Sequence, residues 1–166
     1  MELKDVLQHL GKAAEFVEWR KGHAESYLAH AFVLLDEANK DAWHIGYFTP
    51  ETDRMTTFIV SLRHIEVVPD QEILRSEQAI LELNPADVTL GHEAALKKAE
   101  EYHHLHHPRE IPLKKFFILQ SLDGKAVYNI TFFFQSMKTL NLKLSAADGH
   151  AVSHSFQTLM EFDRKA

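Results

Sequence analysis

The sequence predicts an α+β fold made of two α-β-β-β-type repeats, in which helices pack on antiparallel sheets, preceded by an extra N-terminal helix. Three observations lead to this prediction. Some segments space their apolar residues by three and four, as a helix does, and others alternate or run between turn signals, as strands do. Short stretches of the first half also match stretches of the second half in the same order. With 166 residues, of which 45% are apolar and 25% charged, the chain is long enough to bury a core.

The N-terminal region, residues 1–21, is expected to be an amphipathic helix. Over residues 2–19, one side of this helix carries the apolar residues Leu3, Val6, Leu7, Leu10, Ala14 and Val17. Lys21 and Gly22 mark its end. Such a helix usually packs on its own domain, while pairing with a second subunit to form a homodimer is an open alternative. The acids on this helix argue against binding to an anionic membrane surface.

Residues 22–83 form the first predicted repeat. Its helix is expected over residues 24–35, where six apolar residues recur at helical spacing: Ala24, Tyr27, Leu28, Ala31, Leu34 and Leu35. The predicted strands are residues 43–48, 55–62, 65–68 and 72–83. Pro50 and the Pro69-Asp70 pair provide turns between them.

A linker at residues 84–88, which begins with an Asn-Pro turn signal, leads into the second predicted repeat at residues 89–166. Thr89 is a suitable N-cap for a helix that runs to His107, and Glu93 lies in the first turn, where the helix dipole favours an acid. The predicted strands are residues 114–121, 126–135, 140–146 and 151–162, with hairpin turns at Asp123-Gly124 and Asp148-Gly149.

Three pairs of stretches carry the internal similarity. Residues 76–83 (SEQAILEL) lie over residues 155–162 (SFQTLMEF) without a gap. Residues 57–60 (TFIV) lie over residues 131–134 (TFFF), and residues 43–45 (WHI) lie over residues 116–118 (FFI). Three matches in the same order favour an internal duplication.

Three segments of the second repeat form a pattern of their own. Residues 89–99 (TLGHEAALKKA) start a helix, residues 126–134 (AVYNITFFF) form a Tyr-containing strand, and residues 142–152 (LKLSAADGHAV) place an Asp-Gly turn before a last strand. This pattern resembles the PepSY domain over about residues 89–152, and the first repeat shares the resemblance only through its similarity to the second. The resemblance implies a tandem of non-catalytic modules that bind or inhibit a partner protein, here unidentified.

Composition and motifs argue against several classes of function. A net charge of −6 disfavours binding to nucleic acid. The absence of cysteine excludes disulfides, thiol nucleophiles and iron–sulfur clusters. The chain has no P-loop, no dinucleotide-binding fingerprint and no zinc-protease motif, so we expect a protein that is not an enzyme and has no cofactor. Neither a signal peptide nor a membrane span is recognisable, so we expect a cytoplasmic protein.

The segment YHHLHHP, residues 102–108, raises the question of a metal site. His103 and His107 are four residues apart and would share a helix face, with His106 beside them, so these three are the candidate metal ligands. The competing explanation is that they are solvated side chains in the last turn of a helix, where histidine interacts well with the dipole. The sequence favours this second explanation, because zinc normally takes three or four protein ligands and, apart from Glu100 one turn before His103, no further ligand is evident nearby.

Phenylalanine is abundant, with 11 residues, and is concentrated in the second half. Because adjacent strand residues face opposite sides, one ring of the Phe116-Phe117 pair and the central ring of Phe132-Phe133-Phe134 point away from the principal core. Phe117 and Phe133 are therefore the candidate partner-binding residues. We expect a protein-interaction or regulatory module that offers a strand edge or a sheet face. The alternative is a carrier of a small apolar ligand, which a real cavity would indicate.

Overall fold

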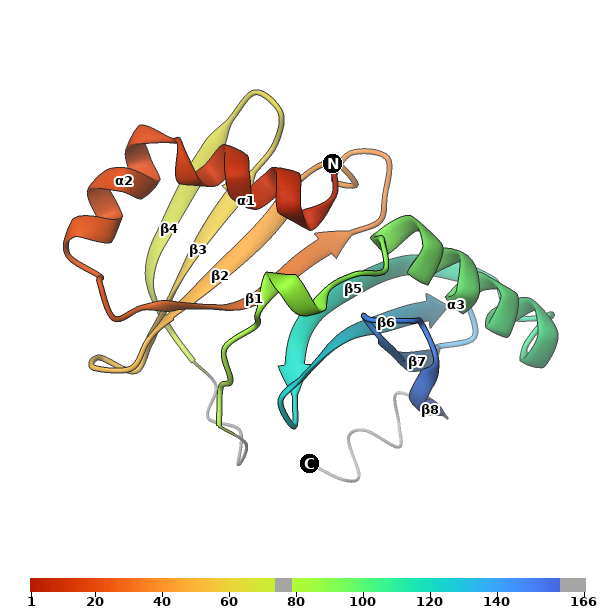
Figure 1. Ribbon diagram of the computed structural model, residues 1–166. Coiled ribbons are helices and arrows are strands. Elements are labelled where there is room, and N and C mark those ends of the chain that lie inside the picture. The colour runs from red at the N-terminus through yellow and green to blue at the C-terminus, as the bar shows by residue number, and fades with distance from the viewer. Residues whose placement is uncertain (74–78, 159–166) are drawn as a thin grey trace.

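The computed structural model describes residues 1–73 and 79–158. In chain order its elements are α1 (Leu3–Gly11), α2 (Ala14–Lys21), β1 (Tyr27–Leu34), β2 (Trp43–Thr49), β3 (Arg54–Val60), β4 (Ile65–Glu72), the short 3-10 helix η1 (Pro85–Asp87), α3 (His92–His106), β5 (Pro112–Leu122), β6 (Lys125–Phe134), β7 (Lys138–Ser145) and β8 (Ala151–Thr158). The strands form one antiparallel sheet in the order β4-β3-β2-β1-β5-β6-β7-β8. The first strand of each half, β1 or β5, therefore lies at the centre of the sheet (Figure 1).

The predicted α+β fold of two α-β-β-β repeats is wrong. The protein is mainly β, and in the described residues one sheet of eight strands runs through both halves. The segment responsible is residues 24–35, which was expected to be a helix but contains β1. This strand is paired on both edges and has apolar residues on both faces, so its sequence is an almost continuous apolar run that also satisfies helical spacing.

The N-terminal helix is divided into two. The expected helix over residues 2–19 breaks after Gly11, and α2 starts at Ala14 and ends at Lys21, where an end was predicted. Leu3, Val6 and Leu10 of α1 are buried, which confirms the predicted apolar side of this part.

The four strands predicted for the second half are confirmed as far as residue 158, beyond which the prediction lies outside the described residues. Gly124 and Gly149 both have a φ of +80°, a conformation that glycine adopts without strain, which explains the two Asp-Gly turns. Thr89 is not the N-cap of α3, which is Gly91. Its hydroxyl instead donates to the carbonyl oxygen of Ala147 at 2.7 Å and fastens the start of this segment to the β7–β8 turn.

The stretches that suggested duplication do not occupy equivalent places. The match between residues 43–45 and 116–118 pairs β2 with the central strand β5, and the match between residues 57–60 and 131–134 pairs β3 with β6. In the third match, between residues 76–83 and 155–162, residues 76–78 and 159–162 lie outside the described residues. Residues 74–78 of the strand expected at residues 72–83 also lie outside them. The described residues 79–83 are not in a strand.

The core is a single layer of side chains between the sheet and the three α-helices, which lie on the same side of the sheet (Figure 1). One row of cross-strand neighbours in this layer consists of Phe58, Ile45, Ala31, Leu119, Tyr128 and Leu144. Ala95 and Ala99 of α3 are completely buried against the layer, and their small side chains let this helix approach the sheet closely. Burial of each large apolar side chain in such a layer contributes about 1.5–3 kcal/mol.

Candidate functional site

The face of the sheet opposite the three α-helices is the candidate site, and we call it the open face. In the described parts of the chain no α-helix packs on it. Because side chains alternate along a strand, the residue that precedes or follows a core-row residue in the sequence points to the open face. One row of cross-strand neighbours there consists of Ile59, His44, Phe32, Ile118, Asn129 and Lys143, all of them half-buried.

The open face is chemically divided. Its part over β1, β2, β3 and β5 is mostly apolar, and the ring centroids of Phe32 and Phe116 lie 5.7 Å apart across the central strand pair. Its part over β6 and β7 carries polar side chains next to Phe133. There the Asn141 amide donates to the side-chain oxygens of Asn129 at 2.5 Å and Thr131 at 3.0 Å.

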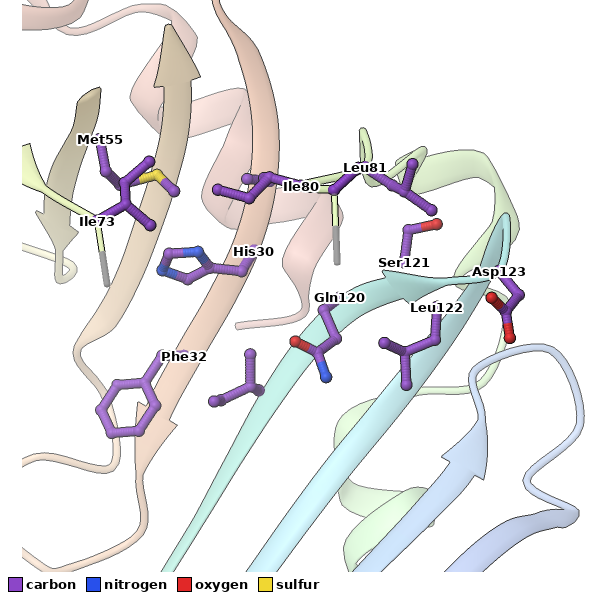
Figure 2. A pocket seen from close by; sticks show the side chains of 13 residues that line it. His30, Phe32, Met55, Ile73, Ile80, Leu81, Gln120, Ser121, Leu122 and Asp123 are labelled. Atoms are coloured by element: carbon purple, nitrogen blue, oxygen red, sulfur yellow. The ribbon is translucent and has the colours of Figure 1, made fainter. Parts of the chain in front are cut away.

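A pocket of about 600 Å³ opens on the apolar part of this face. Figure 2 shows side chains from β1, β3, β5 and the segment that follows residue 78 around it. The lining residues are Ala29, His30, Phe32, Met55, Ile73, Ala79, Ile80, Leu81, Ile118, Gln120, Ser121, Leu122 and Asp123. Most of these side chains are apolar, so the pocket suits an apolar molecule.

Two hydrogen bonds hold one wall of the pocket against β1. The hydroxyl of Tyr27 donates to the carbonyl oxygen of Ile80 at 2.6 Å, and the backbone N–H of Leu83 donates to the carbonyl oxygen of Leu28 at 2.8 Å. Burial, together with the Glu82 carboxylate, raises the pKa of Tyr27, so this hydroxyl keeps its proton and remains a donor. The wall that carries Ile80 is therefore fixed to the sheet.

His30 is the most unusual residue of the pocket. It lies opposite Gly46 of β2, just after an irregularity in the β1–β2 register. A Cβ placed on Gly46 would lie 2.6 Å from Nε2 and 2.7 Å from Nδ1 of His30, which is closer than real Cβ atoms approach other atoms. The missing side chain of Gly46 thus makes room for the imidazole to lie over β2.

The His30 imidazole is neutral at pH 7. Burial lowers the pKa of His30, and the neighbouring His44 lowers this pKa further because two positive imidazoles repel each other. A neutral imidazole has one hydrogen-bond donor and one acceptor. Neither is paired within the part of the chain that the structure describes.

The structure places the two predicted partner-binding residues on opposite faces. Phe117 is completely buried in the core, with its ring centroid 5.6 Å from that of Trp43, so it offers no surface to a partner. Phe133 is half-buried on the open face and lies between Lys114 and Thr139. Its strand, β6, is paired on both sides, so Phe133 does not lie at a sheet edge.

The three candidate metal ligands have separate contacts. His103 is buried, its Nε2 lies 2.8 Å from the carbonyl oxygen of Glu110, and its ring contacts two phenylalanines of β6. The ring centroids of His106 and Tyr102 lie 4.2 Å apart. The His107 ring stacks on that of Phe156, with 4.0 Å between their centroids. Over residues 1–73 and 79–158, no three histidine or acidic side chains are grouped so that they could hold a metal ion.

Sequence reasoning missed His30, Gln120 and the pocket. The described lining residues come from five separate stretches of the chain, so no local motif marks the pocket. One local signal was present, because a glycine inside the strand WHIGYF often indicates that another group approaches the backbone closely.

Comparisons with known proteins give a fold and no function. No family model matches the chain, and no curated protein matches its sequence. Among solved structures, the chain is similar to "a putative lipoprotein" from Clostridium difficile 630, with a TM-score of 0.56 and 9% sequence identity. The alignment covers 86% of this chain and 90% of that one. In the described part of this chain, no helix combines the length and apolar character that crossing a membrane requires.

Proposed function

We propose that the protein is a non-catalytic binding protein that holds a small, mainly apolar ligand in the pocket of the open face. The pocket itself is the observation that carries this proposal. Its volume of about 600 Å³ falls within the range of roughly 300–1,000 Å³ that is typical of small-molecule sites. Apolar walls with a few polar groups among them are also typical of such sites.

The polar groups of the pocket support binding rather than catalysis. A hydrolytic site needs a nucleophile paired with a base, usually through a hydrogen bond. Within the described residues His30 makes no hydrogen bond to Ser121 or to any other hydroxyl, and the Asp123 carboxylate is exposed at the rim. Among its described residues, the pocket therefore has no activated nucleophile.

Titration with the fluorescent apolar probe N-phenyl-1-naphthylamine tests the proposal. We expect saturable binding to the unsubstituted protein, and Ile118→Glu should weaken it at least about tenfold, because a carboxylate on the pocket wall must lose its hydration when the probe binds. Ile59→Glu is the matched control, because Ile59 lies on the open face outside the lining. Absence of saturable binding, or equal losses in both variants, would show that the pocket is not the binding site.

A second candidate function is recognition of a protein partner by the same face, as the resemblance to PepSY domains implies. Half-buried Phe116 and Phe133 lie on the open face outside the pocket lining and would offer apolar contact area to such a partner. A partner captured by the unsubstituted protein should be lost with Phe133→Glu and retained with Ile118→Glu. Capture that persists with Phe133→Glu would show that the partner does not bind this part of the open face.

A further inference from the structure

We infer that the ligand of the open-face pocket carries an uncharged hydrogen-bonding group, such as a hydroxyl, amide or carbonyl, on its apolar body, and that His30 and Gln120 bind this group. The inference rests on the proposed function, because it assigns the chemistry of the ligand in the same pocket.

The two side chains are direct neighbours. His30 of β1 and Gln120 of β5 are cross-strand partners, and the Cβ atoms of such partners lie about 4.5–5.5 Å apart on the same face. Both line the pocket, where Phe32 and Ile118 form the next cross-strand pair on the same face of these two strands. Figure 2 shows the imidazole and the amide among apolar side chains such as Phe32, Ile80 and Leu122. Together they form a polar spot in an apolar wall.

This polar spot has unused hydrogen-bonding capacity. Within the described chain neither the imidazole of His30 nor the side-chain amide of Gln120 has a hydrogen-bond partner. Neither group is sealed from the pocket, because the only buried polar side-chain atom without a partner in the described residues is Nε1 of Trp19. Water can therefore reach both groups while the pocket is empty.

A ligand that fills the pocket removes this water. If the ligand were wholly apolar, the imidazole and the amide would become buried without partners, which is costly. A hydroxyl, amide or carbonyl replaces the lost hydrogen bonds, because the neutral imidazole and the amide each offer a donor and an acceptor. The pocket thus favours ligands that form hydrogen bonds with the imidazole and the amide over ligands that do not.

The charges around the pocket favour an uncharged group. None of the described lining residues is Lys or Arg, so these residues offer a carboxylate no cation in exchange for its lost hydration. Among the described residues, His44 on β2 interacts electrostatically with His30, and Asp123 at the β5–β6 turn is the acidic residue of the pocket lining. Asp123 is exposed at the rim, where solvent and salt screen its attraction for an ammonium group.

Three ligands with the same chain length test the inference: 1-octanol, octanoate and octylammonium, each displacing N-phenyl-1-naphthylamine at pH 7.5. At this pH the acid and the amine are ionised. We expect octanol to bind at least about tenfold more tightly than either ion, because each ion must lose its hydration. If octanoate or octylammonium binds as tightly as octanol, the inference is wrong, while the proposed function stands because the pocket still binds ligands. If neither the probe nor any of the three binds, the proposed function fails.

Substitutions at His30 and Gln120 test whether these two residues cause the preference for a ligand with a hydrogen-bonding group. Ethylbenzene, an apolar compound without a hydrogen-bonding group, serves as the reference ligand. His30→Phe and Gln120→Leu should each lower the ratio of octanol affinity to ethylbenzene affinity about fivefold to tenfold, which corresponds to one hydrogen bond. His30→Gln, which retains a donor and an acceptor, should keep much of the preference.

His44→Phe is the matched control, because His44 is a histidine of the same face that does not line the pocket. It should leave the ratio unchanged. An unchanged ratio in both His30→Phe and Gln120→Leu would overturn the assignment of the polar group to these two residues. Circular dichroism checks the folding of each variant. The comparison of octanol with the two ions uses the unsubstituted protein, so it tests the inference even if a variant does not fold.

Discussion

Replacing Gly46 with alanine tests the geometry on which the pocket depends. Gly46 lies under the His30 imidazole, and an alanine Cβ would overlap the ring, with Nε2 only 2.6 Å away. The backbone at Gly46 is not in the left-handed region, so alanine introduces no backbone strain there. Any loss of stability in Gly46→Ala therefore arises from contact with His30.

The size of the effect follows from two opposing terms. Displacing a packed side chain to accommodate an extra methyl group costs about 1–3 kcal/mol. Replacing glycine with alanine at a compatible backbone position returns about 0.4–1 kcal/mol by restricting the unfolded chain. We therefore expect Gly46→Ala to lower the free energy of unfolding by about 1–2 kcal/mol.

A double-mutant cycle isolates the contact. In a His30→Ala background the overlap is absent, so Gly46→Ala should be neutral or slightly stabilising, and the coupling energy should be about 2 kcal/mol. Urea unfolding followed by circular dichroism measures all four proteins, and the midpoint should shift while the denaturant slope stays constant. Additive effects, with a coupling energy below about 0.5 kcal/mol, would refute the reasoning and place the imidazole elsewhere.

Three further predictions concern single groups. The folded-state pKa of His30 is below its unfolded value, so the unfolded chain binds more protons at mildly acidic pH. The neutral imidazole therefore makes its full contribution to the free energy of unfolding above about pH 6.5, and this contribution is lost as the pH falls through the folded-state pKa. In urea unfolding curves measured at a series of pH values, His30→Gln should make the free energy of unfolding depend less on pH in this range. Glu2→Gln should reduce stability by up to about 1 kcal/mol in low salt and by less in high salt, because the Glu2 carboxylate accepts from the His92 backbone N–H at 3.3 Å and lies 3.1 Å from its Nδ1 at the start of α3. Tyr128→Phe should cost about 1–2 kcal/mol in urea unfolding, because the hydroxyl donates to the Leu90 carbonyl oxygen at 2.6 Å and the change leaves this acceptor without its partner.

The second half of the fold could be predicted because its local signals agree with its tertiary structure. Asp123-Gly124 and Asp148-Gly149 fix two hairpins, and alternation along Tyr128, Ile130 and Phe132 marks the buried face of β6. The first half failed at β1, because a central strand with two apolar faces has no alternation to distinguish it from a helix. The pairing of β1 with β5 is a contact between distant parts of the chain, which no local pattern encodes.

The candidate site was predictable only in outline. The Phe116-Phe117 pair correctly indicated that one ring faces away from the core, but the alternation could not say which one, and the structure places Phe116 on the open face. The histidine-rich segment attracted attention by composition, whereas the single His30 gains its importance from Gly46 on a neighbouring strand. The PepSY resemblance, the domain boundaries, the cytoplasmic location and a homodimer remain predictions from sequence.

The position of the pocket has a consequence for the stability of the sheet. The two halves of the chain meet where β1 pairs with β5 over five residue pairs, and these two strands supply His30, Phe32, Ile118 and Gln120 to the pocket. A ligand that binds only when the two strands are paired stabilises this junction by about 2.7 kcal/mol at a free concentration of 100 times its Kd.

Hydrogen exchange monitored by NMR can detect this stabilisation, because openings of the junction have their own free energy, separate from that of global unfolding. Backbone amides of β1 and β5 that hydrogen-bond across the junction should exchange about 100-fold more slowly with saturating octanol, provided that their exchange occurs through opening of the junction. Amides between β7 and β8, which lie at one end of the sheet, should change much less. Equal slowing in both places would mean that the amides exchange only when the whole sheet unfolds, and unchanged exchange at the junction would mean that the ligand does not bridge the two halves.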